Sequence, residues 1–479
     1  MKEMIGFMLL SKLLENRVIT TLEDREITSI TDDNRKIQEN CLYICIKGEN
    51  FDGHTVAKQA LENGAYAVIV ERDLGLGERQ ILVKDTRDFY GALCATWFDH
   101  PERKMKFIGI TGTNGKTTIT NVIKYILTKN NYKVGLIGTI QNEIGDEIIH
   151  TDNTTPMVFQ LMELYHKMYQ AGCDVVVMEV SSFGLVQKRI GLTYFDIAVF
   201  TNLTQDHLDY HKTMENYYQA KKMLFAVCDK AIINTDDDYG KRLFSEITCE
   251  KYSYGNASDY NYQPICVKAN GTKFLLNNLE VAMQMTGYFN IANATASYAV
   301  CNLLGLENEN ILPYLQTCSG VKGRCEVLPT GKDFSVICDY AHTPDALENI
   351  LENVKLYTEN KLICLFGCGG NRDKTKRPLM AKAAAKFADK LIVTSDNPRD
   401  ENPKEIIADI LTGLKDFNTP YDVVVDRREA IKHALQTAEV GDVIVLAGKG
   451  HEDYQIFENN YHTHFDEREV VAEILKELN

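Results

Sequence analysis

A glycine-rich segment in the first third of the chain has the residue types of a phosphate-binding loop. Residues 109–118 read Gly-Ile-Thr-Gly-Thr-Asn-Gly-Lys-Thr-Thr, between an apolar run and a helical pattern. Glycines let backbone N–H groups wrap closely around an anion, Lys116 adds a positive charge, and Thr117 offers a hydroxyl to Mg²⁺. The strict spacing of such loops requires a glycine where this chain has Ile110. We expect an ATP or GTP site, with a glycine-rich turn and an incidental lysine as the alternative.

Two later segments place further metal-binding side chains after apolar runs. Glu179 interrupts the apolar residues 175–180, and a buried carboxylate is costly unless it is paired or bound to a metal. We therefore favour Glu179 as a second Mg²⁺ ligand. After the apolar residues 197–200 comes a cluster that alone indicates either metal or proton-transfer chemistry or a self-satisfied loop. That cluster contains Asp206, His207, Asp209 and His211.

Four polar loops follow predicted strands in the last third of the chain. They are residues 339–344, 367–374, 395–399 and 448–452, and they are rich in Gly, Asp, Arg and His. In open α/β sheets, ligands bind at the carboxyl ends of the strands. We expect the four loops to converge on one site.

The elements that must position these residues alternate between strands and helices along the whole chain. At 479 residues, the chain exceeds the roughly 250–300 residues of a single core, so we expect two or three domains. We predict three α/β domains: a small one over residues 1–103, a central one with a mainly parallel sheet over 104–328, and a doubly wound, Rossmann-like one over 329–479.

Several finer features follow from the same patterns. We predict a β-hairpin excursion over residues 252–284, a helix over 291–304 and a turn-rich segment over 327–332. In the last domain, the predicted strands are residues 336–339, 362–366, 391–394, 423–425 and 443–446.

The composition excludes several other classes of protein. A formal net charge of −15 without a basic run argues against nucleic-acid binding. No apolar run approaches 18 residues, and residues 1–14 lack a cleavage pattern, so we expect a cytoplasmic protein without membrane insertion. Thirteen scattered cysteines do not form a disulfide framework or a zinc motif, and we expect Cys338 and Cys364 to be buried.

The most specific motifs together resemble one family. They are residues 112–118, 153–156, 179–182, 202–209, 290–294, 323–324 and 339–342. The chain resembles the Mur ligases, the ATP-dependent amide-forming enzymes of peptidoglycan precursor synthesis. Within that family it is similar to members that add a diamino acid to UDP-N-acetylmuramoyl-L-alanyl-D-glutamate.

The resemblance implies that ATP converts the substrate's D-glutamate carboxylate into an acyl phosphate, which the diamino acid's amine then attacks. Positioning and charge neutralisation dominate such chemistry. The resemblance implies catalytic roles for Lys116, His207, Lys221 and Arg324, with Thr117 and Glu179 on the first Mg²⁺ and His207 on a second. It also implies that Lys221 is carbamylated to N6-carboxylysine, although its position alone indicates a solvated helix lysine.

The resemblance also assigns two substrate sites. It implies that Asn290 and Asn293 lie near the nucleotide, Arg324 near the transferred phosphate and Asp339 near the ribose. The full ATP set is Gly112, Thr113, Asn114, Gly115, Lys116, Thr117, Thr118, Asn290, Asn293, Arg324 and Asp339. The full set for the nucleotide-sugar peptide is Asn34, Asn50, Thr154, Thr155, Ser181, Gln187 and Arg189. The chain departs from the family pattern at Asn34, where Ser commonly stands, and at Phe183, where a His often follows the two serines.

The choice of amino acid depends on residues 396–399, Asp-Asn-Pro-Arg, which match the members that add meso-diaminopimelate. Diaminopimelate carries a carboxylate that lysine lacks, and the fork of Arg399 matches it. The full set for diaminopimelate is Arg372, Asp396, Asn397, Arg399, Gly448 and Glu452.

Alternative functions are the same ligase using L-lysine, a paralogue acting on another peptide or carrier, and a non-catalytic nucleotide-binding partner. Folylpolyglutamate synthetases share the phosphate loop, but the first domain and residues 396–399 count against them. We expect a monomer.

Overall fold

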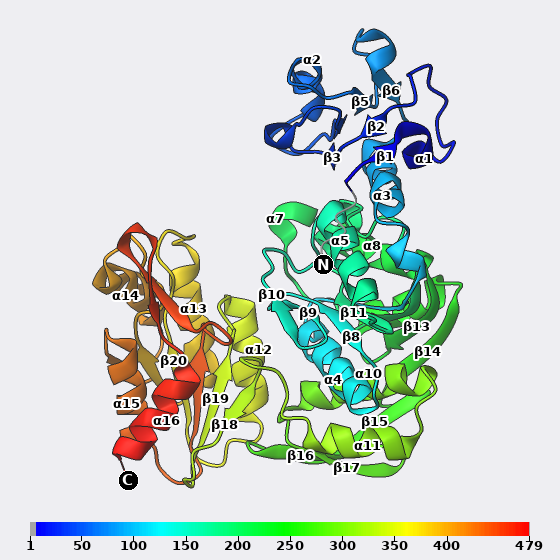
Figure 1. Ribbon diagram of the computed structural model, residues 1–479. Coiled ribbons are helices and arrows are strands. Elements are labelled where there is room, and N and C mark those ends of the chain that lie inside the picture. Colours follow the sequence, from blue (N-terminus) through cyan, green and yellow to red (C-terminus); the bar gives the residue numbers. More distant parts are fainter. Residues whose placement is uncertain (1–5, 479) are drawn as a thin grey trace. The chain divides into compact units, whose positions relative to one another are not determined.

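The computed structural model describes residues 6–478 and divides the chain into two compact units. One unit comprises Met1–Thr113, Asn131–Ile233 and Arg242–Lys251. The other comprises Asn114–Asn130, Asn234–Lys241 and Tyr252–Asn479. Strands and helices alternate in both units (Figure 1), which confirms the predicted α/β class.

The first unit contains a small parallel sheet near the start of the chain. In spatial order its strands are β3 (Ile30–Thr31), β4 (Leu42–Ile44), β5 (Ala67–Val70) and β6 (Gln80–Leu82). Strands β4 and β5 are fully buried, as expected for parallel strands covered on both faces. Helices α2 (Ala57–Glu62) and α3 (Thr86–Trp97) connect and follow them, and α1 (Leu10–Leu14) lies between the paired strands β1 (Met8–Leu9) and β2 (Glu26–Ile27) in the sequence.

A second, mainly parallel sheet in this unit leads into the glycine-rich loop. Its parallel strands, in spatial order, are β8 (Val134–Ile137), β11 (Val175–Glu179), β7 (Lys106–Thr111), β12 (Phe195–Phe200) and β13 (Cys228–Asn234). An antiparallel hairpin of β9 (Asn142–Ile144) and β10 (Glu147–Ile149) extends it. Glu179, the last residue of β11, pairs in register with Ile110, so it lies at the strand end that opens into the loop. The helices between these strands include α5 (Val158–Gln170), α6 (Ser182–Val186), α7 (Leu208–His211) and α8 (Met214–Lys222), and α9 (Asp238–Glu246) follows β13.

The second unit contains the helix that follows the glycine-rich loop, α4 (Lys116–Lys129), which packs against α10 (Tyr288–Leu303). Strand β14 (Glu250–Gly255) leads into an antiparallel meander of β15 (Tyr260–Lys268), β16 (Gly271–Leu276) and β17 (Leu279–Met283). The predicted hairpin over residues 252–284 therefore has one more strand than a hairpin. The third antiparallel strand follows the tight turn at Asn277 and Asn278, both with positive φ. Helix α11 (Asn308–Thr317) completes this part.

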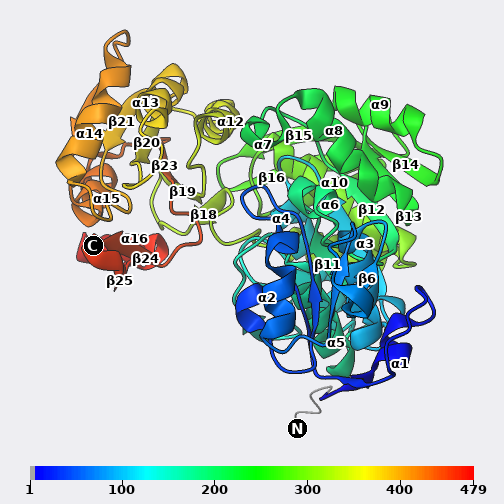
Figure 2. The same ribbon diagram turned by 90° about the horizontal axis from the view of Figure 1, so that it is seen from above.

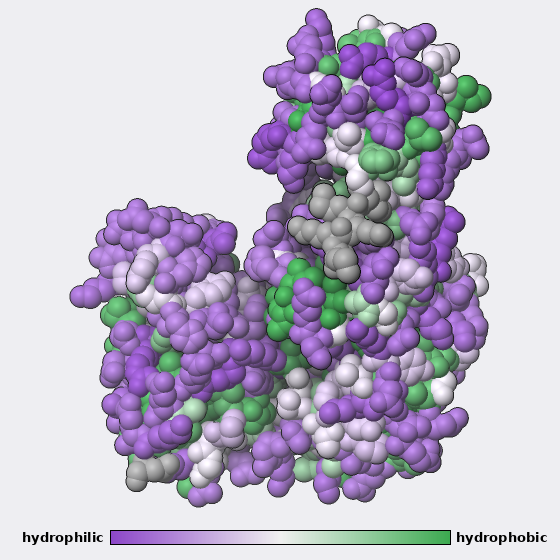
Figure 3. Space-filling model, viewed as in Figure 1, coloured by the Kyte–Doolittle hydropathy of each residue, from purple (hydrophilic) through white to green (hydrophobic). Residues whose placement is uncertain are grey.

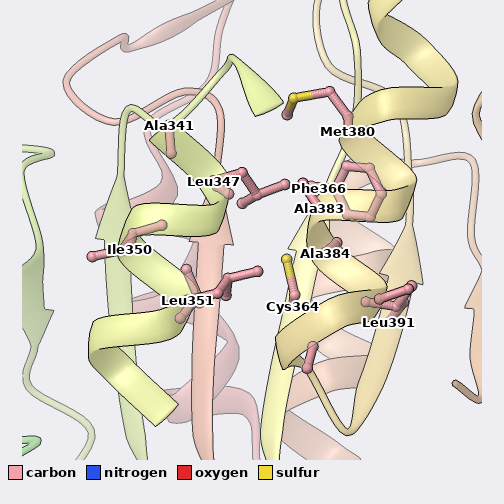
Figure 4. Close-up of a cluster of buried hydrophobic side chains, with 14 of the residues drawn as sticks. Ala341, Leu347, Ile350, Leu351, Cys364, Phe366, Met380, Ala383, Ala384 and Leu391 are labelled. Atoms are coloured by element: carbon pink, nitrogen blue, oxygen red, sulfur yellow. The ribbon is translucent and has the colours of Figure 1, made fainter. Parts of the chain in front are cut away.

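The last part of the chain forms a doubly wound sheet. Its order is β18 (Glu326–Leu328), β19 (Ser335–Asp339), β23 (Val443–Ala447), β20 (Leu362–Phe366), β21 (Lys390–Val393) and β22 (Tyr421–Val423), parallel except for β18. On one face, Ile337, Cys364 and Phe366 pack against α12 (Pro344–Lys355), α13 (Lys376–Phe387) and α14 (Pro403–Leu411) (Figure 4). On the other, Cys338, Ile363 and Leu446 pack against α15 (Arg427–Thr437) and α16 (Glu467–Glu477), so the sheet lies between α13 and α16 (Figure 2).

The sequence predictions for this sheet need three corrections. The segment 327–332 is not wholly a turn, because Glu326–Leu328 form the edge strand β18. The fourth predicted strand lies two residues too late, since β22 ends at Val423. The hairpin of β24 (Tyr454–Phe457) and β25 (Tyr461–His464) was not predicted.

The surface and the cysteines agree with the composition. The face shown in Figure 3 is mainly hydrophilic, with one larger apolar area near its centre and smaller ones elsewhere. All thirteen cysteines are free thiols, and Cys338 and Cys364 are buried as predicted. Across residues 6–478, we find no helix with the length and apolar character needed to span a membrane.

Candidate active site

The glycine-rich loop depends on glycine at two positions for steric reasons. Gly112 has φ +146°, and a Cβ there would lie 1.8 Å from the Thr201 hydroxyl oxygen. Gly115 has φ +86° and caps the start of α4, and its Cβ would lie 2.5 Å from the Asn293 side-chain oxygen. The segment 112–118 therefore has the close-packed backbone that a phosphate cradle requires, with Lys116, Thr117 and Thr118 in the first turn of α4.

Lys221 is buried against this loop. Only 2% of the residue is exposed, and its Nζ atom donates a 2.7 Å hydrogen bond to the Gly112 carbonyl oxygen. The ammonium also lies 4.5 Å from the centre of the Tyr217 ring, and Thr113 contacts the Tyr217 hydroxyl at 3.3 Å. Lys221 is thus not the solvated lysine that its sequence context indicates.

Glu179 is a buried carboxylate held in a fixed orientation. The backbone N–H and the hydroxyl of Thr139 each donate to it at 3.0 Å, and its own carbonyl accepts from the Thr155 hydroxyl at 3.1 Å. A Cβ on Gly138 would lie 2.6 Å from a Glu179 carboxylate oxygen, so a larger residue there would displace this carboxylate. Sequence reasoning missed Thr139, whose only signal is its position just after β8.

The residues predicted for the nucleotide-sugar peptide gather around Glu179. The Thr154 and Thr139 hydroxyls are 3.0 Å apart, and Arg189 donates to the Thr155 carbonyl at 2.9 Å. Gln187 accepts two hydrogen bonds from Arg189, at 3.0 and 2.8 Å. The Ser181 hydroxyl caps α6 by accepting from the Gly184 N–H at 3.0 Å. Thr154, Thr155, Ser181, Gln187 and Arg189 therefore form one connected group.

The other two residues predicted for this substrate lie apart from that group along the chain. Asn34 begins a short 3₁₀ helix, Asn34–Lys36, which is capped by Asp33. Asn50 is exposed in the loop before the second such helix, Gly53–Val56.

His207 lies beside an aromatic group that includes the unusual Phe183. Its ring centroid is 5.2 Å from that of Phe183 and 6.1 Å from that of Tyr217, and its side chain lies 3.4 Å from Asp206. The neighbouring His211 is buried and contacts the Ser182 hydroxyl at 2.9 Å. Burial and the nearby Lys221 lower the pKa of His211, which favours its neutral form. In residues 6–478, no three His, Cys, Asp or Glu side chains are grouped to hold a metal ion.

Asp339 and Arg324 lie together in the second unit. The Asp339 carboxylate accepts from the backbone N–H groups of Cys325 and Ala341 at 2.7 and 2.8 Å, and burial raises its pKa while Arg324 opposes the shift. The Arg324 guanidinium lies 4.9 Å from the centre of the Tyr340 ring. Asn290 and Asn293 are both buried, and their side chains are linked by a 3.0 Å hydrogen bond.

The Gly323 and Gly450 backbones press against each other. A Cβ on Gly323 would lie 2.1 Å from the backbone of Gly450 and His451, and one on Gly450 would lie 2.8 Å from the Gly323 carbonyl oxygen. Both residues have positive φ. The turn that carries Arg324 and the loop that carries Glu452 are therefore in direct contact.

The polar loops after β20, β21 and β23 converge as predicted. Asn397 donates to Glu452 at 3.0 Å, Arg399 donates to the Gly370 carbonyl at 3.0 Å, and a Cβ on Gly448 would lie 3.5 Å from the Asp396 carboxylate. Arg399 has φ +50°, a left-handed conformation that is uncommon for residues other than glycine, and its side chain reaches the loop after β20. Arg372 is exposed on that loop. The fourth loop, 339–344, lies beside them, since the rings of Tyr340 and His451 are 4.8 Å apart.

Comparison with known proteins places this geometry in a family. Residues 26–97 match the model described as Mur ligase family, catalytic domain, residues 110–301 match the Mur ligase middle domain, and residues 323–450 match the Mur ligase, glutamate ligase domain. A protein of Caldanaerobacter subterraneus subsp. tengcongensis is 46% identical over 462 residues, which cover 94% of this chain and 95% of that protein. The chain belongs to the Mur ligase family.

Three of the similar Mur ligases carry the same name. The Caldanaerobacter protein is named UDP-N-acetylmuramoyl-L-alanyl-D-glutamate–2,6-diaminopimelate ligase. A Clostridium acetobutylicum ligase of the same name, numbered 1, is 45% identical, with 95% of each chain covered. A solved structure of a ligase of that name superimposes with a TM-score of 0.74 at 30% identity and covers 98% of this chain and 99% of its own. The three-domain Mur ligase architecture is therefore shared over nearly the whole length.

Proposed function

We propose that this Mur ligase joins meso-2,6-diaminopimelate to the D-glutamate carboxylate of UDP-N-acetylmuramoyl-L-alanyl-D-glutamate in peptidoglycan precursor synthesis. The names of the similar ligases support this substrate pair. The observation that carries the choice of amino acid is the placement of Arg399. Its guanidinium is held by the Gly370 carbonyl at 3.0 Å, in the same group of loops as Asp396, Asn397 and Glu452. A guanidinium there suits the second carboxylate of diaminopimelate.

ATP would supply the phosphoryl group that turns the D-glutamate carboxylate into a reactive acyl phosphate. The chain's own residues would bind, orient and neutralise charge. The N–H groups of residues 112–118 and Lys116 would hold phosphates, and Asn290, Asn293 and Asp339 would hold the nucleoside. The connected group of Thr154, Thr155, Ser181, Gln187 and Arg189 would orient the peptide carboxylate. Arg324, whose Nε atom is buried without a hydrogen-bond partner, would stabilise the transferred phosphate.

The donor atoms fit Mg²⁺. Hard oxygen ligands suit this ion, and Thr117 and Glu179 offer a hydroxyl and a buried carboxylate. A carbamate on Lys221 would replace a cation by an anion beside the loop, which would favour a bound cation. His207, half exposed, would serve a second Mg²⁺ as a supplementary ligand.

The remaining sequence predictions stay predictions. We propose domains at 1–103, 104–328 and 329–479. The matches at 26–97 and 110–301 lie within the first two, and the third match begins before the proposed boundary, at residue 323. We also propose that the protein is a cytoplasmic monomer and that Asn34 and Asn50 bind the uridine end of the substrate.

The deciding experiment is phosphate release from ATP and Mg²⁺ with UDP-N-acetylmuramoyl-dipeptide, comparing meso-diaminopimelate with L-lysine. We expect turnover with diaminopimelate and a kcat/KM for lysine that is lower by about 10²-fold or more. Equal or faster turnover with lysine would contradict the choice of amino acid. Absence of turnover with both would favour a paralogue on another carrier or a non-catalytic nucleotide-binding partner.

A further inference from the structure

Lys449 is a fully buried lysine with no assigned role in the proposed reaction. None of the residue is exposed, and it lies in the loop that carries Gly448 and Glu452. Its Nζ atom donates to the Tyr454 carbonyl at 2.6 Å and to the Asn397 side-chain oxygen at 3.0 Å. It also forms ion pairs with Asp396 at 3.3 Å and with Glu452 at 3.4 Å. A buried ammonium is costly unless it is paired in this way, so the arrangement is specific.

Three of these four partners belong to the set predicted to contact diaminopimelate. The Asn397 side-chain oxygen accepts from Lys449 and from the Ile456 N–H at 3.1 Å. This fixes the amide so that its nitrogen donates to Glu452 at 3.0 Å. Lys449 therefore contacts Asp396, Asn397 and Glu452 at once, from two different loops.

The charges around Lys449 are also matched to a ligand. Asp396 and Glu452 are two carboxylates, and like charges this close repel. One lysine between them leaves one net negative charge, which suits one ammonium group. The nearby buried Arg427 does not serve the same purpose, because its guanidinium is paired with the buried Glu467 at 2.7 Å.

We propose that Lys449 is a positioning residue for the amino-acid substrate: it holds Asp396, Asn397 and Glu452 in the arrangement that receives the distal ammonium group of the diamino acid. The inference rests on the proposed function and deepens it. Lys449 acts through these three side chains and takes no part in the phosphate chemistry.

The test compares steady-state kinetics of Lys449→Met with those of the wild type, using the full-length protein. We expect the KM for meso-diaminopimelate to rise about tenfold or more, because charged hydrogen bonds are lost, while the KM for ATP changes by less than about twofold. Lys382→Met, which changes an exposed lysine on α13, is the matched control and should keep kcat and both KM values. A uniform fall in kcat with an unchanged KM for diaminopimelate would overturn the proposal.

A double-mutant cycle separates positioning from general stability. In a Glu452→Gln background, Lys449→Met should raise the KM less than it does alone, because the ion pair with Glu452 is already gone while the contacts with Asp396 and Asn397 remain to be lost. Equal effects in both backgrounds would overturn the proposal. If Lys449→Met does not fold, Lys449→Gln keeps an N–H donor for the Tyr454 carbonyl and carries the same expectation.

The outcomes also separate this inference from the proposed function. Turnover of meso-diaminopimelate by the wild type supports the function whether or not Lys449 matters. If the wild type uses L-lysine instead, the proposed amino-acid substrate is wrong. The same KM comparison, made with L-lysine, then tests the positioning role of Lys449. Turnover with neither amino acid overturns both.

Discussion

The Nζ atom of Lys221 lies 2.7 Å from the Gly112 carbonyl oxygen, so a lysine on α8 donates directly to the backbone of the glycine-rich loop. We expect Lys221→Met to lower kcat by about 10²-fold or more, because both the loop contact and the site of carbamylation are lost. The adjacent Lys222→Met removes only a surface ion pair with Glu246 and should change kcat little. ¹³C NMR with labelled bicarbonate should show a carbamate signal in the wild type that Lys221→Met lacks; equal kcat values would refute this role.

Gly112→Ala should weaken ATP binding and lower stability, because the new Cβ would clash with Thr201 and the residue would be held at positive φ. Gly172→Ala is the matched control. Gly172 also has positive φ, +79°, but a Cβ there meets nothing within 4 Å. The control should lose only about 1–2 kcal/mol of unfolding free energy and keep its ATP affinity. Calorimetric ATP titration and urea unfolding measure the two effects, and equal ATP affinities would count against the cradle.

Glu179→Gln should raise the Mg²⁺ concentration needed for half-maximal turnover by about tenfold, since a charged oxygen ligand becomes neutral. Glutamine is close in size and can still accept from Thr139. Glu163→Gln, on the exposed side of α5, should leave the Mg²⁺ requirement unchanged. Removal of Mg²⁺ by a chelator should abolish turnover in every variant. An unchanged Mg²⁺ requirement in Glu179→Gln would exclude Glu179 as a ligand.

Arg399→Lys should reduce the preference for meso-diaminopimelate over L-lysine by about tenfold or more, because lysine cannot form the bidentate pair. Both side chains would occupy the same backbone position with φ +50°, so the substitution isolates the guanidinium. The ratio of kcat/KM values for the two amino acids measures the effect. Weaker ATP binding in this variant would contradict the assignment of Arg399 to the amino-acid site.

His451 should make stability fall on acidification. Burial, Arg324, Arg468 and Lys322 lower its pKa from 6.5 to about 4. Its folded-state pKa lies below the unfolded value, so its contribution is complete above about pH 6.5 and is lost as the pH falls toward 4. Urea unfolding at pH 7 and pH 5 should show a smaller decrease for His451→Asn than for the wild type. An identical decrease would mean that other groups dominate this range.

The sequence predicted most of the elements that carry the site. The continuous apolar runs of β11 and β20 identified buried parallel strands, and polar loops at their ends pointed to one ligand edge. The hairpin of β24 and β25 was not predicted because each strand has only four residues and β25, Tyr-His-Thr-His, is polar. Its turn, Asn459 and Asn460 with φ near +59° and +58°, was the available signal.

The burial and the partners of individual side chains could not be predicted from the sequence. Lys221 and Lys449 lie in polar stretches, yet both are buried, because residues from distant segments, Gly112 for Lys221 and Asn397 for Lys449, contact them. Glu179 was easier, since a carboxylate within an apolar strand is conspicuous on its own. Thr139, its hydrogen-bond donor, has no such signal.

The backbone contact between Gly323 and Gly450 limits how this enzyme can be re-engineered. Neither position tolerates a side chain, because each faces the other's main chain. A graft that replaces residues 448–452 to change the amino acid would therefore have to import the matching 321–324 turn from the same donor. Libraries that randomise only one of the two segments should yield mostly unfolded or inactive clones.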